Sequence, residues 1–145
     1  MLSIIELDQK QSQLCFELDS TSIRLWSNEQ WSSEFKKEGV KVFGLLQSTK
    51  IVGVYVFQEV KDEAHINYFL IDQKFRRRGY GSYLMNHLID QCRIKNLKKL
   101  LLEVSEANST ANNFYNKFEF LTVGKRKNYY RDGSDALLKE KKLIK

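Results

Sequence analysis

The apolar pattern of this sequence changes its period once, near residue 80, and this change restricts the fold more than any other feature. Before it, apolar residues alternate with others over three segments, at residues 40–47, 51–60 and 64–71, and only a few residues connect them. Such short connections can join antiparallel strands, whereas parallel strands need a crossover of about a dozen residues or more. We therefore expect an antiparallel meander in the middle of the chain.

A helix and a buried strand are expected after the meander. Apolar residues recur at helical spacing between residues 81 and 95, in one stripe formed by Leu84, Met85, Leu88, Ile89 and Cys92. The run Leu100–Val104 is apolar apart from Glu103, which predicts a strand that is buried on both faces. Because a helix separates this strand from the one before it, the two strands should be parallel.

The ends of the chain supply the remaining elements. Asn28 is expected to cap a short helix that carries Trp31 and Phe35 on one face, and Asn108 or Ser109 should cap another. Further strands are expected at 1–8, 120–130 and 135–143, and a further helix at 9–18. The fold class is therefore α+β: a mixed, mostly antiparallel sheet of about seven strands with a central β–α–β crossover and four helices.

Length and cysteine content set the broad class. The chain has 145 residues, which fits one domain spanning residues 1–145. Two cysteines, Cys15 and Cys92, can form neither a disulfide framework nor a four-thiolate metal site. The first residues, Met1–Glu6, do not have the pattern of a signal peptide, and no apolar run approaches the length of a membrane span. We expect a cytoplasmic protein with no membrane or metal site.

Charge is unevenly distributed along the chain. Residues 1–72 hold 7 basic against 11 acidic side chains, and residues 73–145 hold 17 against 7, so the halves carry −4 and +10 and the whole +6. A basic half suits a polyanion such as nucleic acid or a phosphorylated cofactor, and an acidic half suits a cationic substrate. Nucleic-acid binding is not expected, because the sequence has neither zinc-ligand spacing nor an RNA-binding aromatic signature.

One basic, glycine-containing string stands between a predicted strand and a predicted helix. Glycines allow a tight turn whose N–H groups converge on an anion, and the helix adds unpaired N–H groups and its positive dipole end. This favours a pyrophosphate site, although an arginine-rich turn at a helix start would have the same string. The pattern is neither a P-loop nor a Rossmann fingerprint. Its residues are Arg76, Arg77, Arg78, Gly79, Tyr80, Gly81 and Ser82.

Two further residues are candidates for proton transfer. Glu103 is a lone carboxylate in an apolar strand, so it either faces a cleft or has a raised pKa, and both suit a general base. The alternative is a residue at the end of the strand that points into solvent. Tyr115 follows on the next helix, at the sheet end where the anion site is expected, and a phenol there could donate a proton to a leaving group. The alternative is a core tyrosine with a solvated hydroxyl.

With these segments in order, the chain resembles the GNAT acetyltransferase superfamily over essentially its whole length. The string Arg76–Gly81 matches that family's Gln/Arg-x-x-Gly-x-Gly/Ala acetyl-CoA motif. The match is closer still to the RimI-type N-terminal acetyltransferases of bacteria. The strings that carry it are Trp26-Ser27, Leu102-Glu103-Val104, Asn108, Tyr115-Asn116-Lys117-Phe118-Glu119-Phe120, and Arg126-Lys127-Asn128-Tyr129-Tyr130 followed by Asp132-Gly133-Ser134-Asp135-Ala136.

This resemblance implies a cosubstrate and its contacts. Acetyl-CoA would lie in the V where the third and fourth core strands splay apart, with no metal. The backbones of Phe69, Leu70 and Ile71 would face the pantetheine arm, and the Ile71 N–H would polarise the thioester carbonyl. The backbone of residues 77–82 would hold the pyrophosphate, and Asn108 would contact the pantetheine.

The resemblance also implies roles in the reaction. Glu103, acting through water, would take a proton from the substrate ammonium, and Tyr115 would protonate the departing thiolate. Trp26, Tyr129 and Tyr130 would line the peptide groove. An α-amine has an unperturbed pKa near 8, against about 10.4 for lysine, so the demand on the base would be mild.

The expected function is therefore N-terminal acetylation by an acetyl-CoA-dependent acyltransferase. Its acceptor would be the N-terminal alanine of a small-subunit ribosomal protein, number eighteen, drawn in by the acidic first half. One alternative is a small-molecule amine acetyltransferase acting on a polyamine or aminoglycoside. Another is a non-catalytic module that binds acyl-CoA or the ribosome, although intact Glu103 and Tyr115 argue against it.

One departure from the family pattern has a structural consequence. A glycine normally stands just before the Phe of the turn after the last helix, and this chain has Glu119 there. The position is expected to have a positive φ, which a residue with a Cβ adopts with some strain. We therefore expect slight strain at the end of this helix.

Overall fold

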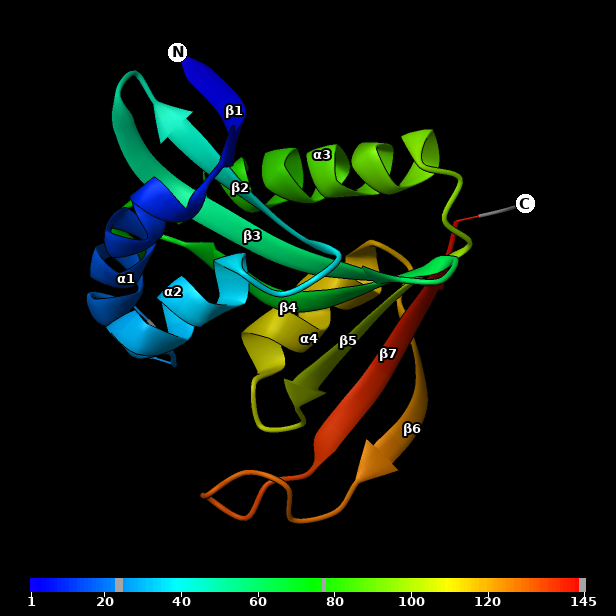
Figure 1. Cartoon of the computed structure of the whole chain (residues 1–145). Helices are drawn as coiled ribbons and strands as arrows, with labels where there is room; N and C mark the ends of the chain where they lie inside the picture. Colours follow the sequence, from blue (N-terminus) through cyan, green and yellow to red (C-terminus); the bar gives the residue numbers. More distant parts are fainter. Residues whose placement is uncertain (23–24, 77, 144–145) are drawn as a thin grey trace. The chain divides into compact units, whose positions relative to one another are not determined.

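The structure is a computed structural model that describes residues 1–22, 25–76 and 78–143. Strands and helices follow one another in the predicted order (Figure 1). Two short 3-10 helices, η1 and η2, accompany them. The elements are β1 (Leu2–Leu7), η1 (Gln9–Gln11), α1 (Ser12–Ser20), α2 (Asn28–Phe35), β2 (Val40–Gln47), β3 (Lys50–Val60), β4 (Glu63–Ile71), η2 (Gln73–Phe75), α3 (Tyr80–Ile94), β5 (Lys99–Ser105), α4 (Ser109–Lys117), β6 (Leu121–Arg126) and β7 (Ala136–Lys142).

The strands form one seven-stranded sheet in the order β1-β2-β3-β4-β5-β7-β6. β4 and β5 are parallel, with Glu63 opposite Lys99, and α3 lies between them in the sequence. The registers of β1 with β2, β2 with β3, β5 with β7 and β6 with β7 are antiparallel. The predicted fold class, including the central β–α–β crossover and the four α-helices, is therefore confirmed.

By internal packing, the chain divides into two compact units. Unit 1 comprises residues 1–59 and 67–91, and unit 2 comprises residues 60–66 and 92–145. β4 contributes residues to both units, because the boundary falls within that strand. No helix among the described residues is long and apolar enough to cross a membrane.

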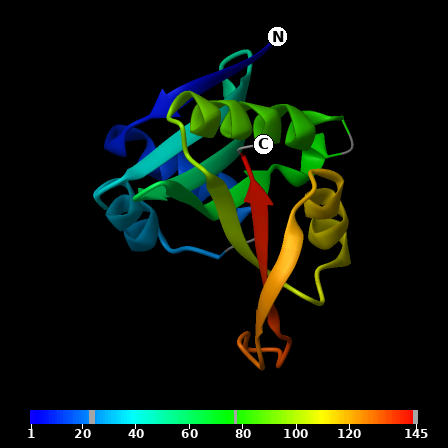
Figure 2. The ribbon, with the colours of Figure 1, turned by 90° about the vertical axis from the view of Figure 1, so that its right-hand side faces the viewer.

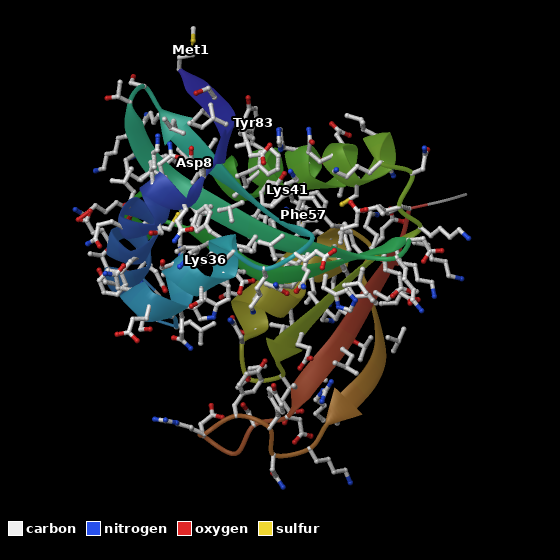
Figure 3. The ribbon with its side chains drawn as sticks, viewed as in Figure 1. Met1, Asp8, Lys36, Lys41, Phe57 and Tyr83 are labelled. Carbon is white, nitrogen blue, oxygen red and sulfur yellow. The ribbon has the colours of Figure 1, made fainter. Side chains whose placement is uncertain are left out.

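Unit 1 has helices on both faces of its strands. α1 and α2 cover one face, where the buried side chains of Trp31 and Tyr68 belong to the same core cluster. α3 covers the other face, where His87 Nδ1 lies 2.9 Å from the Tyr55 hydroxyl and its ring packs on Phe43 (Figures 1 and 2). Phe57 on β3, which Figure 3 labels, is fully buried.

The start of α2 differs from the prediction by one residue. Ser27, not Asn28, is the N-cap: its hydroxyl accepts a hydrogen bond of 3.1 Å from the Gln30 N–H, and Gln30 Oε1 accepts one of 2.7 Å from the Ser27 N–H. This reciprocal pair is a capping box, which needs a glutamine or glutamate three residues after the cap. Asn28 has no such residue at the matching position, since Trp31 stands there.

A buried carboxylate organises the core of unit 1 beside these helices. Asp19, at 0% exposure, accepts hydrogen bonds from the Trp31 indole N–H at 3.0 Å and from the Tyr68 hydroxyl. It also accepts bonds from the backbone N–H groups of Leu25 at 3.2 Å and Trp26 at 3.0 Å. A buried charge is tolerated only when it is well paired or hydrogen-bonded, and four donors meet that condition here.

Unit 2 departs from the prediction that β5 is buried on both faces. Leu100, Leu102 and Val104 are buried, whereas Glu103 between them is exposed. Since side chains alternate along a strand, only one face of β5 is fully covered. α4 lies over the covered face, because Asn116 accepts a hydrogen bond of 3.1 Å from buried Lys139, which stands opposite Leu102. Glu103 therefore points away from α4.

Candidate functional site

The predicted anion site in unit 1 begins where η2 ends and α3 starts. Gly79 has a φ of +78°, and a Cβ added there would meet no atom within 4 Å, so open space adjoins the loop. The Gly79 carbonyl accepts the first helical bond, 3.0 Å from the Tyr83 N–H. The N–H groups that precede Tyr83 in the first turn then have no partner within the helix, which is the arrangement that binds an anion.

The second glycine of this string plays a different part from the one predicted. Gly81 lies in the first turn of α3 with helical backbone, so of these two glycines only Gly79 has a left-handed conformation. Ser82 lies in the same turn. The predicted cradle would therefore be completed by the free N–H groups of this turn and not by a second tight turn.

Charged and aromatic side chains surround this loop. Arg76 and Arg78 are exposed, and the Arg78 guanidinium carbon lies 5.0 Å from the centre of the Phe75 ring. Tyr80 stacks on the same ring, with 6.0 Å between the ring centres. The predicted Arg77 lies outside the described residues. A guanidinium placed over an aromatic ring is partly held in place while its N–H groups remain available to an anion.

The predicted pantetheine segment lies at the end of β4, also in unit 1. Leu70 is buried, whereas Phe69 and Ile71 are half-buried. β3 approaches this segment closely, because a Cβ added to Gly53 would lie 2.8 Å from Ile71 Cδ1 and 3.2 Å from the Leu70 carbonyl oxygen. A side chain at Gly53 would therefore require the Ile71 side chain and the Leu70 carbonyl to shift.

Trp26, predicted to line the peptide groove, is packed against the core of unit 1. Its ring meets Trp31 edge-on with 4.8 Å between centres, and Tyr68 likewise with 4.7 Å. Its backbone N–H is held by Asp19. The indole is only partly buried, so one edge of it stays at the surface of the loop before α2.

In unit 2, Glu103 lies on the face of β5 that α4 leaves uncovered, and its side chain is 36% exposed. The Glu103 carboxylate is therefore accessible, and its role as a general base stays a prediction. One oxygen, Oε2, lies 3.5 Å from Nε of Arg126 on β6. No role was predicted for Arg126 from the sequence. It was named there only as the first residue of the Arg-Lys-Asn-Tyr-Tyr string that carries the family resemblance.

Tyr129 and Tyr130, which were predicted to line the peptide groove, lie on the loop between β6 and β7, drawn in orange in Figure 1. Their rings meet edge-on with 5.2 Å between centres; Tyr129 is 56% exposed and Tyr130 is half-buried. Burial, with smaller contributions from the charge of Glu103 and from Tyr129, raises the pKa of Tyr130. Glu103 and Tyr130 are therefore electrostatic neighbours.

Internal hydrogen bonds shape this loop. Asp135 accepts a bond of 2.8 Å from the Asn128 N–H, and its own carbonyl accepts one of 3.0 Å from the Glu106 N–H. A tight turn follows Tyr130, because the Gly133 N–H donates to the Tyr130 carbonyl at 3.0 Å with a φ of +86° at Gly133. The tyrosines are thus presented by a loop that is ordered by its own backbone.

Asn108 has a structural part that the resemblance did not imply. Its side-chain oxygen caps α4 by accepting a bond of 3.1 Å from the Ala111 N–H. The prediction that Asn108 or Ser109 is the cap is settled in favour of Asn108. Its amide nitrogen is the group that remains for a ligand, since the oxygen is used by the cap.

Tyr115 is positioned by the end of α4. The Phe120 N–H donates to the Tyr115 carbonyl at 3.1 Å and the Glu119 N–H to the Asn116 carbonyl at 3.0 Å, which together form a Schellman motif. The motif sets the Tyr115 ring against buried Phe120, with 5.6 Å between centres. Burial raises the pKa of the Tyr115 hydroxyl to about 12, so it is protonated at neutral pH.

Glu103 and Tyr115 do not act as a hydrogen-bonded pair in this structure. Among the described residues, none hydrogen-bonds the Tyr115 hydroxyl, and Arg126 is the ion-pair partner of Glu103. They are held separately, one on the uncovered face of β5 and the other on α4. Separate placement suits a base and an acid that serve different atoms of a reaction.

The positive φ predicted at Glu119 is confirmed: this residue has a φ of +67° as the C′ residue of the Schellman motif. Glu119→Gly should therefore raise the free energy of unfolding by about 0.5–1 kcal/mol, since glycine adopts this conformation without a Cβ penalty. Urea titration of both proteins measures the difference. Asn113→Gly, in the middle of α4, is the contrasting control and should lower stability; if Glu119→Gly does the same, Glu119 is not strained.

Comparison with known proteins identifies the family of this chain. The acetyltransferase (GNAT) family model matches residues 3–120. The [ribosomal protein bS18]-alanine N-acetyltransferase of Escherichia coli K12 is 33% identical over 116 residues, which cover 78% of each chain. The enzyme of the same name from Haemophilus ducreyi is 32% identical over 101 residues, 67% of this chain and 70% of that one.

Solved structures agree with the sequence comparison. The ribosomal-protein-S18-alanine N-acetyltransferase from Escherichia coli has a TM-score of 0.93 at 28% identity, covering 100% of this chain and 96% of that chain. Ard1 from Thermoplasma volcanium has a TM-score of 0.89 at 27% identity, covering 99% of both. The chain therefore belongs to the acetyltransferase (GNAT) family of acyl-transferring enzymes.

Proposed function

We propose that this enzyme transfers the acetyl group of acetyl-CoA to the N-terminal α-amine of alanine on a small-subunit ribosomal protein, bS18. The observation that carries the proposal is 33% identity over 116 residues to an enzyme named for that reaction. The accessible carboxylate of Glu103, with exposed Tyr129 and half-buried Tyr130 nearby, supports a peptide acceptor over a small amine, since aromatic side chains offer contact area to a chain.

The residues of unit 1 fit the phosphate end of acetyl-CoA. Gly79 leaves open space beside the first turn of α3, and the N–H groups of that turn with the exposed Arg76 and Arg78 would bind the pyrophosphate. Arg77, Tyr80, Gly81 and Ser82 belong to the same proposed site. Backbone groups of Phe69, Leu70 and Ile71, and the amide nitrogen of Asn108, would bind the pantetheine arm.

The bound thioester supplies an activated acetyl group, and the side chains move protons. Glu103, directly or through water, accepts a proton from the substrate ammonium and leaves a neutral amine that can attack. As the C–N bond forms and the C–S bond breaks, Tyr115 gives its proton to the sulfur. Its raised pKa of about 12 keeps that proton available at neutral pH. The new amide nitrogen loses one proton, which passes through solvent to the Tyr115 phenolate, and Glu103 releases its proton to solvent. Both groups are thereby restored, with one proton released in each turnover.

The setting of the reaction follows from the acceptor. We propose that the whole chain works as one acetyltransferase domain, since β4 runs through both units and the sheet is continuous. We further propose that it acts in the cytoplasm, where ribosomal proteins are made. Both cysteines, Cys15 and Cys92, are free and buried, which agrees with a reducing compartment. Trp26, Tyr129 and Tyr130 would contact the acceptor peptide.

Mass spectrometry of a short peptide tests the proposal. The peptide begins with alanine and carries one internal lysine, and it is incubated with the enzyme and acetyl-CoA. We expect one acetyl group, located by fragmentation on the α-amine. The same peptide with a blocked N-terminus is the control and should gain none. Acetylation of spermidine but not of the peptide would support a small-molecule enzyme, and acetylation of neither would contradict both.

A further inference from the structure

Glu103 shares the uncovered face of the unit 2 strands with Arg126, whose position follows from the strand register. Glu103 stands opposite Leu138 on β7, and Leu138 stands opposite Gly124 on β6. Arg126 lies two residues beyond Gly124, so its side chain leaves the sheet on the same face as Glu103. The residue opposite Arg126 is Ala136, whose small side chain lets the guanidinium lie across β7 toward the carboxylate.

The ion pair between Arg126 and Glu103 engages only one oxygen of the carboxylate. Nε of Arg126 lies 3.5 Å from Oε2 of Glu103, and the second oxygen has no partner among the described residues. An arginine stays protonated and has no acceptor atom, so it can neither compete for the transferred proton nor supply one. Its part is therefore to orient the carboxylate.

A second contact holds the arginine itself. The ring centre of Tyr129 lies 5.6 Å from the guanidinium carbon of Arg126, a cation–π distance. Tyr129 in turn packs edge-on against Tyr130, which senses the charge of Glu103. Glu103, Arg126, Tyr129 and Tyr130 therefore form one connected group, here named the Glu103 cluster.

We propose that Arg126 is a positioning residue that holds the Glu103 carboxylate for proton transfer from the acceptor ammonium. The proposal rests on the proposed function, because it assigns Arg126 a part only through the base. An ion pair this exposed contributes little to the stability of a fold, so stability alone gives little reason for it. An error of about 1 Å in the position of a catalytic group, by contrast, can reduce the rate by about 100-fold.

The test is a double-mutant cycle with the alanine peptide. We expect Arg126→Ala to lower kcat by about tenfold or more, to leave KM for acetyl-CoA unchanged, and to leave the melting temperature within a few degrees. Arg126→Lys should recover part of kcat because it keeps the charge. In a Glu103→Gln background, Arg126→Ala should have less than about a twofold effect, because the base on which Arg126 acts is gone.

Lys127 supplies the matched control, since it is exposed, adjacent and equally charged. Lys127→Ala should keep the kcat of the unmodified enzyme. The proposal is overturned if Arg126→Ala behaves like Lys127→Ala, or if it lowers kcat equally with and without Glu103. If Arg126→Ala does not fold, Arg126→Gln replaces it in the same cycle. An unmodified enzyme that leaves the peptide unacetylated would instead refute the proposed function.

Discussion

Glu103→Gln should lower kcat for the alanine peptide by about 10²–10⁴-fold, the usual contribution of a general base. The amide has nearly the shape of the carboxylate but accepts no proton at neutral pH. Glu103 is accessible and lies on a β5 face that α4 leaves open, so the substitution should not disturb the core. Steady-state rates at pH 7 with saturating acetyl-CoA measure the effect.

The loss should shrink as the pH rises. The α-amine of a peptide has an unperturbed pKa near 8, so above about pH 8 much of it is already neutral and needs no base. Glu106→Gln is the matched control, because Glu106 is an exposed carboxylate nearby that pairs with Lys125 at 3.9 Å. Equal rates for Glu103→Gln and the unmodified enzyme at pH 7 would show that another group accepts the proton.

Asp19→Ala should lower the free energy of unfolding of the protein by about 3–5 kcal/mol, because several buried or partly buried donors lose their acceptor at once. Four donors lose their acceptor: the Trp31 indole, the Tyr68 hydroxyl and the N–H groups of Leu25 and Trp26. Each buried donor without a partner costs about 1–3 kcal/mol. Since small proteins are stable by only about 5–15 kcal/mol, this is a large fraction.

Tryptophan fluorescence during urea titration measures this change, because both tryptophans pack beside Asp19. Glu17→Ala is the control: Glu17 is exposed on the same helix, and its loss should change stability by less than about 0.5 kcal/mol. Asp19→Asn should lie between the two, since it keeps one acceptor but loses the charge. If Asp19→Ala were as stable as Glu17→Ala, the Asp19 hydrogen bonds would contribute nothing net.

Patterns set by neighbouring residues were predictable from the sequence. β2 was predicted at its observed bounds, Val40–Gln47, and α3 within one residue of its start and end. The positive φ of Glu119 was expected from the glycine that the family pattern has at this place after the helix. In each case the controlling interactions join residues close in the sequence, such as alternating side chains, a helical stripe or a C-terminal cap.

The sequence predictions were wrong where the outcome depended on which elements pack together or which residues compete for a cap. The apolar run Leu100–Val104 suggested two buried faces, but the observed sheet covers only one of them. The residue types of a strand do not show whether one or both of its faces are buried, because the elements that pack on each face are far away in the sequence. The N-cap of α2 was misplaced for a smaller reason, since the capping box of Ser27 and Gln30 competes with Asn28.

The sequence alone determined the order of elements, the β–α–β crossover, the Gly79 turn and the family motifs, because each depends on spacing within a short stretch of chain. The tertiary structure decided which side chains meet. Arg126 contacts Glu103 across β7, and Asp19 accepts hydrogen bonds from residues as far apart in the sequence as Leu25 and Tyr68. Contacts of this kind depend on strand register and on the packing of helices against the sheet, which no local pattern encodes.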